Sequence, residues 1–317
     1  MTAIETTALT KRHGDARAVD GLDLTVESGE VFGFLGPNGA GKSTTIDLLL
    51  GFQRPTAGSV TVLGRDATDE AREVRARTGL LPEGYDLYEN LTARDHLRSA
   101  IEAKDADDDP DAIVERVGLD PDDARRAVGE YSKGMTQRLA LGVALVGDPD
   151  LLILDEPSSG LDPSGAKRLR EIVRTEAERG ATVFFSSHVL GQVERVCDRV
   201  GIMADGELVT VDALDDLRAS MDATTVVEAT VDASPEPDAV AGIEGVSGVT
   251  VDGRVVRAAC ATDDAKVAVL DRLNDATTVR DFDTEAPSLE ALFEAYTSER
   301  AVDGPDGSVA VAGGESR

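Results

Sequence analysis

Apolar residues along this chain gather in short continuous runs that are separated by longer stretches of mixed apolar and charged residues. The runs at 31–35 and 151–154 contain no polar side chain, and the run at 181–185 contains one threonine. Such uninterrupted runs are typical of strands that are buried on both faces of a sheet. Helical patterns lie between them, as at 164–179, so the alternation predicts an α/β fold built on a mainly parallel sheet.

The same patterns divide the chain into a large first domain and a small second one. In the first domain, residues 1–220, further strands are predicted at 4–9, 18–26, 59–63 and 79–83, with a short helix at 68–77. From about 91 to 147 the pattern is helical and holds no convincing strand. We therefore expect a helical subdomain over about 85–147.

The character of the sequence changes after residue 220. Strands are predicted at 224–231, 248–251, 254–258 and 277–283, with helices at 263–274 and 288–299. Asp252-Gly253 joins two of these strands by a tight hairpin turn. The order β-α-β-β-α-β plus a helix suits a small α+β, ferredoxin-like domain over 221–300. Residues 301–317, rich in Gly, Ala and Asp, are expected to form a disordered tail.

The composition is strongly acidic. The 317 residues include 61 Asp and Glu but 32 Lys and Arg, a net charge of −29 that is spread along the chain. Such a surface offers no basic face to neutralise phosphates, so we expect no nucleic acid as partner. It suits a protein from a salt-adapted, halophilic organism, because salt screens the repulsion among the carboxylates.

Other features predict a cytoplasmic protein. The two cysteines, Cys197 and Cys260, lack metal-ligand spacing and are expected to be free thiols. The N-terminus does not look like a signal peptide, and no apolar run approaches the ~18–20 residues of a membrane span. Any membrane role is therefore expected to need a partner protein.

An acidic stretch from Asp105 to Asp111 begins like a calcium-binding loop. Pro110 stands where such a loop requires glycine, and Arg116 stands where it requires glutamate. A solvated loop between helices is the favoured interpretation.

The most informative stretch follows the first buried strand and fits the phosphate-binding pattern G-x-x-x-x-G-K-[ST]. It consists of Gly36, Pro37, Asn38, Gly39, Ala40, Gly41, Lys42, Ser43 and Thr44. A helix is predicted directly after it, so backbone N–H groups of the turn point into one concavity. Lys42 adds a full positive charge, and the Ser43 hydroxyl suits Mg²⁺. Because both flanks have the required strand and helix, a chance match is disfavoured and we predict a nucleotide-phosphate site.

A second candidate site lies at the end of the buried strand 151–154, where Asp155 and Glu156 are adjacent. One carboxylate at this place can hold Mg²⁺ against nucleotide phosphates, and the other can deprotonate an attacking water. An Asp-Glu pair at a strand end is a weak signal by itself. Here it follows a phosphate loop, which favours phosphate chemistry.

With three further motifs, residues 4 to about 220 resemble the ATP-binding subunits of ABC transporters. Residues 131–138, Tyr-Ser-Lys-Gly-Met-Thr-Gln-Arg, match the family's signature motif, whose commonest form is L-S-G-G-Q. Residues 159–162 match the D-loop, which includes Asp162, and His188 matches the switch histidine. The resemblance implies a P-loop NTPase fold and an ATPase that uses ATP and Mg²⁺.

By this resemblance, two copies pack head to tail, and each ATP lies between the phosphate loop of one copy and the signature of the other. Signature contacts would come from Ser132, Lys133, Gly134 and Met135. Glu156 would be the general base, and His188 would contact the γ-phosphate. The metal ion would be bound by Ser43, Asp155 and Glu83.

Four residues depart from the commonest family pattern. Glu83 stands where glutamine is usual, and a carboxylate can still bind Mg²⁺. Lys133 replaces a signature glycine and either adds charge near the phosphate or points to solvent, and Met135 replaces the signature glutamine. His13 stands where an aromatic ring usually stacks on adenine, a contact that an imidazole can also make. A further histidine, His96, matches no motif and is expected to be exposed on a helix.

The motifs at 81–83, 131–135 and 287–293 resemble a subgroup whose ATPases serve exporter-type permeases for drugs and antibiotics. We therefore expect an ATP-hydrolysing subunit that drives a separate multi-span membrane permease, for export. It would be peripheral on the inner face of the cell membrane, and its partner ATPase subunit would be a second copy of the chain.

Two other functions stay open. A soluble ABC-type ATPase of translation or DNA repair would act without a permease. Translation factors usually carry two cassettes, and repair ATPases separate the motifs by a long coiled coil, and neither pattern occurs here. A regulator that binds nucleotide without turnover is the other alternative, and the presence of both Glu156 and His188 argues against it.

Overall fold

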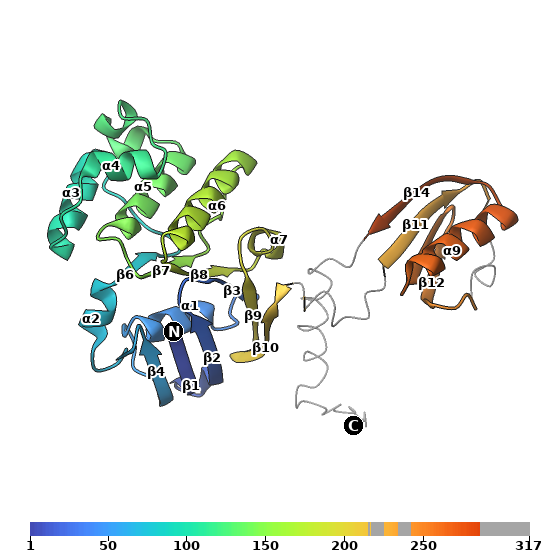
Figure 1. Ribbon diagram of the computed structural model, residues 1–317, viewed down its shortest axis with the longest axis horizontal. Coiled ribbons are helices and arrows are strands. Elements are labelled where there is room, and N and C mark those ends of the chain that lie inside the picture. The colour runs from blue at the N-terminus through green and yellow to red at the C-terminus, as the bar shows by residue number, and fades with distance from the viewer. Residues whose placement is uncertain (215, 217–224, 234–241, 286–317) are drawn as a thin grey trace, which may run out of the picture. The chain divides into compact units, whose positions relative to one another are not determined.

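The computed structural model describes residues 1–214, 216, 225–233 and 242–285 (Figure 1). The chain divides into two compact units, Met1–Ser220 and Met221–Arg317. Each unit has its own sheet structure and its own hydrophobic core.

A six-stranded sheet with the order β10-β9-β3-β8-β7-β6 forms the centre of the first unit. Its strands are β3 (Val31–Leu35), β6 (Thr78–Leu81), β7 (Leu151–Asp155), β8 (Thr182–Ser187), β9 (Arg199–Ala204) and β10 (Glu207–Ala213). All neighbours pair in parallel except β9 and β10. The predicted mainly parallel sheet is confirmed, whereas β9 and β10 occupy a stretch for which the sequence predicted no strand.

An antiparallel sheet with the order β2-β1-β4-β5 packs on helix α1 (Lys42–Leu49). Its strands are β1 (Thr2–His13), β2 (Ala16–Glu27), β4 (Ala57–Val62) and β5 (Arg65–Asp66). One continuous core joins residues of both sheets to α1, including Leu22 of β2, Phe34 of β3 and Leu49 of α1. Because α1 is buried in this core, the phosphate loop at its N-terminus has a fixed position.

The helical subdomain lies between β6 and β7 in the chain. It contains α3 (Ala93–Lys104), α4 (Pro110–Arg116) and α5 (Lys133–Leu145), which group together in Figure 1. Two short 3-10 turns, Asp123–Arg125 and Val128–Glu130, precede α5. The other helices of the unit, α2 (Ala71–Ala76), α6 (Pro163–Glu178) and α7 (Leu190–Val193), lie in connections between strands.

The expectation that His96 is exposed is wrong. Its side chain is buried in the first turn of α3, with Nδ1 2.8 Å from the Thr92 carbonyl oxygen. Its Nε2 accepts the Tyr88 backbone N–H at 2.9 Å. A carbonyl can only accept and an amide N–H can only donate, so Nδ1 carries the hydrogen and the ring is neutral. His96 therefore ties the segment before α3 to the helix, through backbone partners that no sequence motif reveals.

The second unit is a four-stranded antiparallel sheet with the order β12-β13-β11-β14 and one described helix. Its elements are β11 (Thr225–Val231), β12 (Val246–Asp252), β13 (Val255–Cys260), α9 (Asp263–Ala276) and β14 (Val279–Glu285). Val227, Val256 and Val269 form the centre of its core. Three predicted parts of this unit lie wholly or largely outside the described residues: the helix between β11 and β12, the helix at 288–299 and the tail at 301–317. The full ferredoxin-like arrangement therefore stays a prediction.

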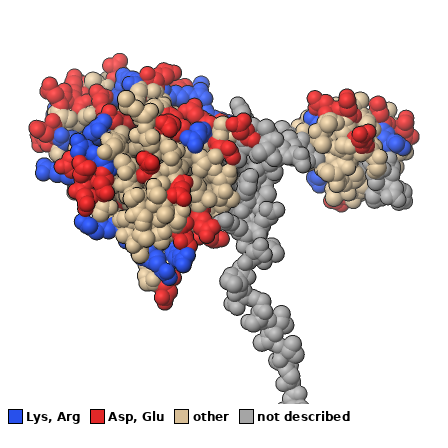
Figure 2. Space-filling view, turned by 60° about the horizontal axis from the view of Figure 1, so that its bottom comes forward, with Lys and Arg blue, Asp and Glu red and all other residues tan. Residues whose placement is uncertain are grey.

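The surface of the first unit carries acidic side chains around much of the face in Figure 2, with a broad uncharged area in its centre. Among the described residues, no helix has the length and apolar character needed to cross a membrane.

Candidate active site

The phosphate loop connects β3 to α1 with a backbone that depends on glycine at three positions. Gly39 and Gly41 have positive φ values of 85° and 107°, which L side chains rarely adopt. A Cβ at Gly41 would lie 2.2 Å from the Ala18 carbonyl oxygen, and one at Gly36 would lie 2.6 Å from that of Met203. The loop therefore fits closely between β2 and β9.

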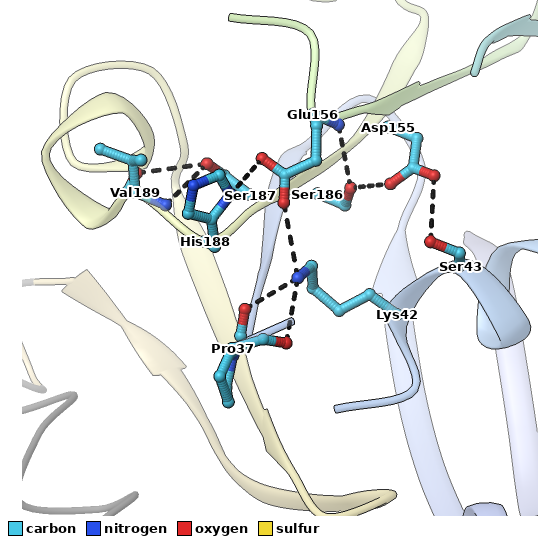
Figure 3. A network of polar contacts seen from close by, with 10 residues as sticks. Pro37, Lys42, Ser43, Asp155, Glu156, Ser186, Ser187, His188 and Val189 are labelled. Atoms are coloured by element: carbon cyan, nitrogen blue, oxygen red, sulfur yellow. Dashed lines mark hydrogen bonds and ion pairs between the residues drawn. The ribbon is translucent and has the colours of Figure 1, made fainter. Parts of the chain in front are cut away.

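Lys42, the first residue of α1, is buried and is held by three oxygen atoms. Its Nζ donates to the Gly36 carbonyl at 2.8 Å and to the Pro37 carbonyl at 3.4 Å. The same ammonium lies 3.4 Å from Glu156 Oε1 (Figure 3). Its charge thus stays inside the curve of the loop, where the phosphates of a nucleotide would lie.

Asp155 ends β7 beside the start of α1. One of its carboxylate oxygens accepts from Ser43 Oγ at 3.3 Å, and the other accepts from Ser186 Oγ on the neighbouring strand β8. The described residues hold no group of three or more His, Cys, Asp and Glu that could bind a metal by themselves. A hydroxyl and a carboxylate side by side do suit Mg²⁺, which takes one or two protein ligands and completes its shell with phosphate and water.

Glu156 is buried in a backbone conformation that is unusual for its residue type. Its φ is +48°, and its backbone N–H donates to both the carbonyl and the hydroxyl of Ser186 at 3.2 Å. Its Oε2 lies 2.8 Å from His188 Nδ1, and its buried Oε1 makes no hydrogen bond but lies 3.4 Å from Lys42 Nζ in an ion pair. A carboxylate only accepts, so His188 Nδ1 carries the hydrogen. A buried carboxylate on a strained backbone, with one oxygen that makes no hydrogen bond, is typical of a reactive group.

Glu83 lies in the loop after β6 and lines a hollow of about 420 Å³ together with Asp155 and Glu156. The first turns of α5 form another wall of this hollow and contribute Lys133. The structure therefore brings Glu83 to the same edge of the sheet as the two carboxylates of β7. It leaves Glu83 exposed.

The signature residues lie in different surroundings. Ser132 is the N-cap of α5, where its backbone and side-chain oxygens accept the Met135 N–H. Ser132, Lys133 and Gly134 line a second hollow of about 430 Å³ with Asp162, the N-cap of α6. The Gly165 N–H donates to Asp162 at 2.9 Å and holds the pKa of this carboxyl below its usual value. No phosphate-loop residue lines this second hollow.

His13 ends β1 opposite Ala16, at the tip of the β1–β2 hairpin, and is exposed. Strand β2 of the same hairpin packs on the phosphate loop close to this tip, because the Ala18 carbonyl lies against Gly41. The contact of His13 with adenine stays a prediction.

Sequence reasoning missed Ser186, which is fully buried and contacts both Asp155 and Glu156. The only signal was a pair of serines that ends strand β8 directly after its apolar residues. It also missed the pairing of His188 with Glu156, since the two residues come from different strand ends.

Comparison with known proteins agrees with this geometry. Residues 19–159 match the family described as "ABC transporter", and residues 213–297 match "ATP-binding protein DrrA1-3-like, C-terminal domain". The chain is 36% identical to the daunorubicin resistance ATP-binding protein DrrA3 of Streptomyces coeruleorubidus, over 92% of this chain and 95% of that protein. It is 42% identical to the bacitracin transport ATP-binding protein BcrA of Bacillus licheniformis, over 68% and 72% of the two chains.

A solved ATP-binding subunit of an ABC transporter superposes with a TM-score of 0.63 at 30% identity, covering 69% of this chain and 93% of its own. The phosphate loop, the carboxylates at the end of β7 and this likeness agree on the P-loop NTPase fold. The chain belongs to the ATP-binding proteins of ABC transporters, within the subgroup of the drug-export ATPases, and is an ATPase of that family.

Proposed function

We propose that this protein binds ATP and Mg²⁺ between the phosphate loop and the end of β7, and hydrolyses ATP to drive an export permease. The observation that carries the proposal is the convergence of Lys42, Ser43, Asp155, Glu156 and His188 in one connected network (Figure 3). It joins a phosphate-binding cation, a pair of metal-binding oxygens and a buried carboxylate base.

The roles follow from the contacts of each side chain. Lys42 would leave the loop carbonyls and Glu156 to bind the β- and γ-phosphates, which offer its ammonium more charge than the carbonyls do. When bound, Mg²⁺ would neutralise part of the triphosphate charge, held by Ser43 and Asp155 with Glu83 nearby. Glu156 would take a proton from the attacking water through Oε1, which makes no hydrogen bond and would be released when Lys42 moves to the phosphates.

His188 would hold Glu156 in place through Nδ1–H, which leaves Nε2 to face the γ-phosphate. The Ser186 contacts to the Glu156 backbone support the same arrangement, since they maintain the positive φ that aims this side chain into the site.

A second copy of the chain is proposed to complete the site. The N-terminus of α5 and the exposed Ser132 form an anion-binding end that no phosphate of the same subunit's loop is expected to reach. A head-to-tail homodimer would place it on the ATP of the other copy.

Two substitutions test this arrangement. Lys42→Ala should abolish binding of a labelled ATP analogue, whereas Ser132→Arg should leave binding by the monomer intact and prevent the ATP-dependent dimer on gel filtration. Equal loss of nucleotide binding in both variants would contradict the head-to-tail arrangement.

The proposed partner is a multi-span permease at the inner face of the cell membrane, and the proposed direction is export of a drug-like compound. Support comes from the names of the similar proteins, which include bacitracin transport, daunorubicin resistance and fluoroquinolones export. Affinity purification from detergent-solubilised membranes should recover the protein with a multi-span protein in stoichiometric amount. Recovery of the protein from the soluble fraction alone, with no such partner, would instead favour a soluble ATPase.

A further inference from the structure

Two residues that depart from the commonest family pattern, Glu83 and Lys133, line the same hollow. This hollow, of about 420 Å³, is bounded by the loop after β6, the first turns of α5 and the end of β7. Glu83 belongs to the first wall and Lys133 to the second. Residues far apart in the sequence thus bring a carboxylate and an ammonium, both on exposed side chains, to one hollow.

The other charged groups of this hollow are already engaged. Asp155 accepts from Ser43 and Ser186, and Glu156 contacts His188 and Lys42. Within the described part of the chain, no ion pair of 4.0 Å or less involves Glu83 or Lys133. The hollow therefore contains one carboxylate and one ammonium without a counter-charge.

The position of Lys133 is restricted by its neighbour Gly160. A Cβ at Gly160 would lie 1.8 Å from Lys133 Nζ and 2.8 Å from its Cε, so the end of the lysine side chain passes directly over this glycine. Gly160 has a φ of +70°, in the region that favours glycine. The lysine also lines the second hollow with Ser132 and Asp162, so its side chain borders both hollows.

We propose that Lys133 is a positioning residue for ATP hydrolysis, whose ammonium pairs with the Glu83 carboxylate across this hollow and couples the loop after β6 to the first turn of α5. A carboxylate and an ammonium that line one hollow attract each other, and the attraction weakens with their separation and with exposure to water. The pair supplies the counter-charge that a carboxylate at position 83 requires beside Asp155 and Glu156. The same pair makes the loop after β6 and the signature of one subunit move together. This inference rests on the proposed function.

A double-mutant cycle tests the pairing, with Lys133→Gln, Glu83→Gln and the double variant. Each single variant leaves one charge without its partner and should lower kcat about fivefold, equivalent to about 1 kcal/mol in the activation free energy, with little change in KM. The double variant should lose no more than either single one, and Lys133→Arg should retain activity within about twofold. Lys167→Gln is the control, because this exposed lysine lies on α6 outside the hollow.

Losses that multiply in the double variant would overturn the proposal, since they would show that the two side chains act independently. A Lys133→Gln effect that appears in KM for ATP and is the same with Glu or Gln at position 83 would overturn it too, and would assign the lysine to phosphate binding instead.

A second measurement does not depend on activity. Zero-length carbodiimide coupling with MgADP present, followed by peptide mass spectrometry, should yield an amide bond between Glu83 and Lys133. A link from Lys133 to Glu156, or no link, would contradict the pairing. Loss of ATPase activity in every variant together with the wild type would count against the proposed function, whereas a missing link in an active enzyme would count against the pairing alone.

Discussion

The buried ion pair between Arg116 and Glu176 should be costly to break. Arg116 ends α4, and its guanidinium donates to both carboxylate oxygens of Glu176 on α6, with Nε at 2.8 Å. The side chains are 14% and 3% exposed. The bidentate contact raises the pKa of Arg116, so the folded state favours its charged form, which persists at every pH where the protein is folded.

The expected loss in the free energy of unfolding follows from the burial of the two side chains. Arg116→Met leaves the Glu176 carboxylate buried, and Arg179 Nη1 at 3.5 Å is then its one counter-charge among the described residues. Removing one partner of a buried pair costs about 3–5 kcal/mol, and the remaining arginine places the expected loss near the lower end of this range. Asp148→Asn removes a contact to the same guanidinium, at 2.7 Å, but this carboxylate is 77% exposed. Its loss should cost less than about 1 kcal/mol.

The double replacement Arg116→Met/Glu176→Leu should recover most of the loss and lie within about 1 kcal/mol of the wild type, because no unpaired charge is left buried. Hydrogen exchange of peptides from α4 and α6 measures these differences within the full chain, with peptides of α9 in the other unit as an internal reference. If Arg116→Met and Asp148→Asn lower protection equally, or if the double variant is worse than Arg116→Met, the argument from burial is wrong.

Three further predictions concern the surroundings of the site. Burial raises the pKa of Tyr85 to about 12 from its usual 10.0, so the folded state holds this proton more tightly and the free energy of unfolding should fall as pH rises between these values. Tyr85→Phe should lessen that fall in thermal melts, and an unchanged pH profile would refute the assignment. Gly41→Ala should lower the free energy of unfolding by at least about 1 kcal/mol more than Gly39→Ala does. The reason is that a Cβ at position 41 would lie 2.2 Å from the Ala18 carbonyl oxygen, whereas a Cβ at position 39 would meet nothing within 4 Å. Equal melting temperatures of the two variants would argue against the close fit of the loop. The net charge of −29 makes the chain repel itself, and salt screens this repulsion, because the Debye length falls from about 10 Å at 0.1 M to about 3 Å at 1 M. Melting temperature and ATPase rate should therefore both rise between about 0.1 and 2 M KCl. A steady decline of both would contradict the expected screening.

The sequence predicted those parts of the site whose chemical role can be recognised from residue type and spacing alone. Lys42 and Ser43 belong to a contiguous loop whose glycines, strand and helix can all be recognised locally. Asp155 and Glu156 follow a continuously buried strand, and parallel strands bring their carboxyl ends to one edge of the sheet.

Contacts between distant segments could not be predicted. The positive φ of Glu156 depends on Ser186 of the neighbouring strand, and the burial of His96 depends on two backbone atoms of its own loop. Strand β10 has no clear alternation, because all seven of its residues are only partly buried. The neighbourhood of Lys133 and Glu83 likewise appears only once α5 and β6 are placed in space.

The most direct measurement of the central claim is single-turnover ATP hydrolysis by Glu156→Gln, compared with equilibrium binding of ATP by the same variant. The amide keeps the size of the side chain but cannot accept the proton of the attacking water, whereas Lys42, Ser43 and Asp155 remain in place. We predict that binding of ATP stays within about threefold of the wild type while the hydrolysis rate falls at least about 100-fold. Hydrolysis at the wild-type rate, with ATP bound normally, would show that Glu156 is not the general base.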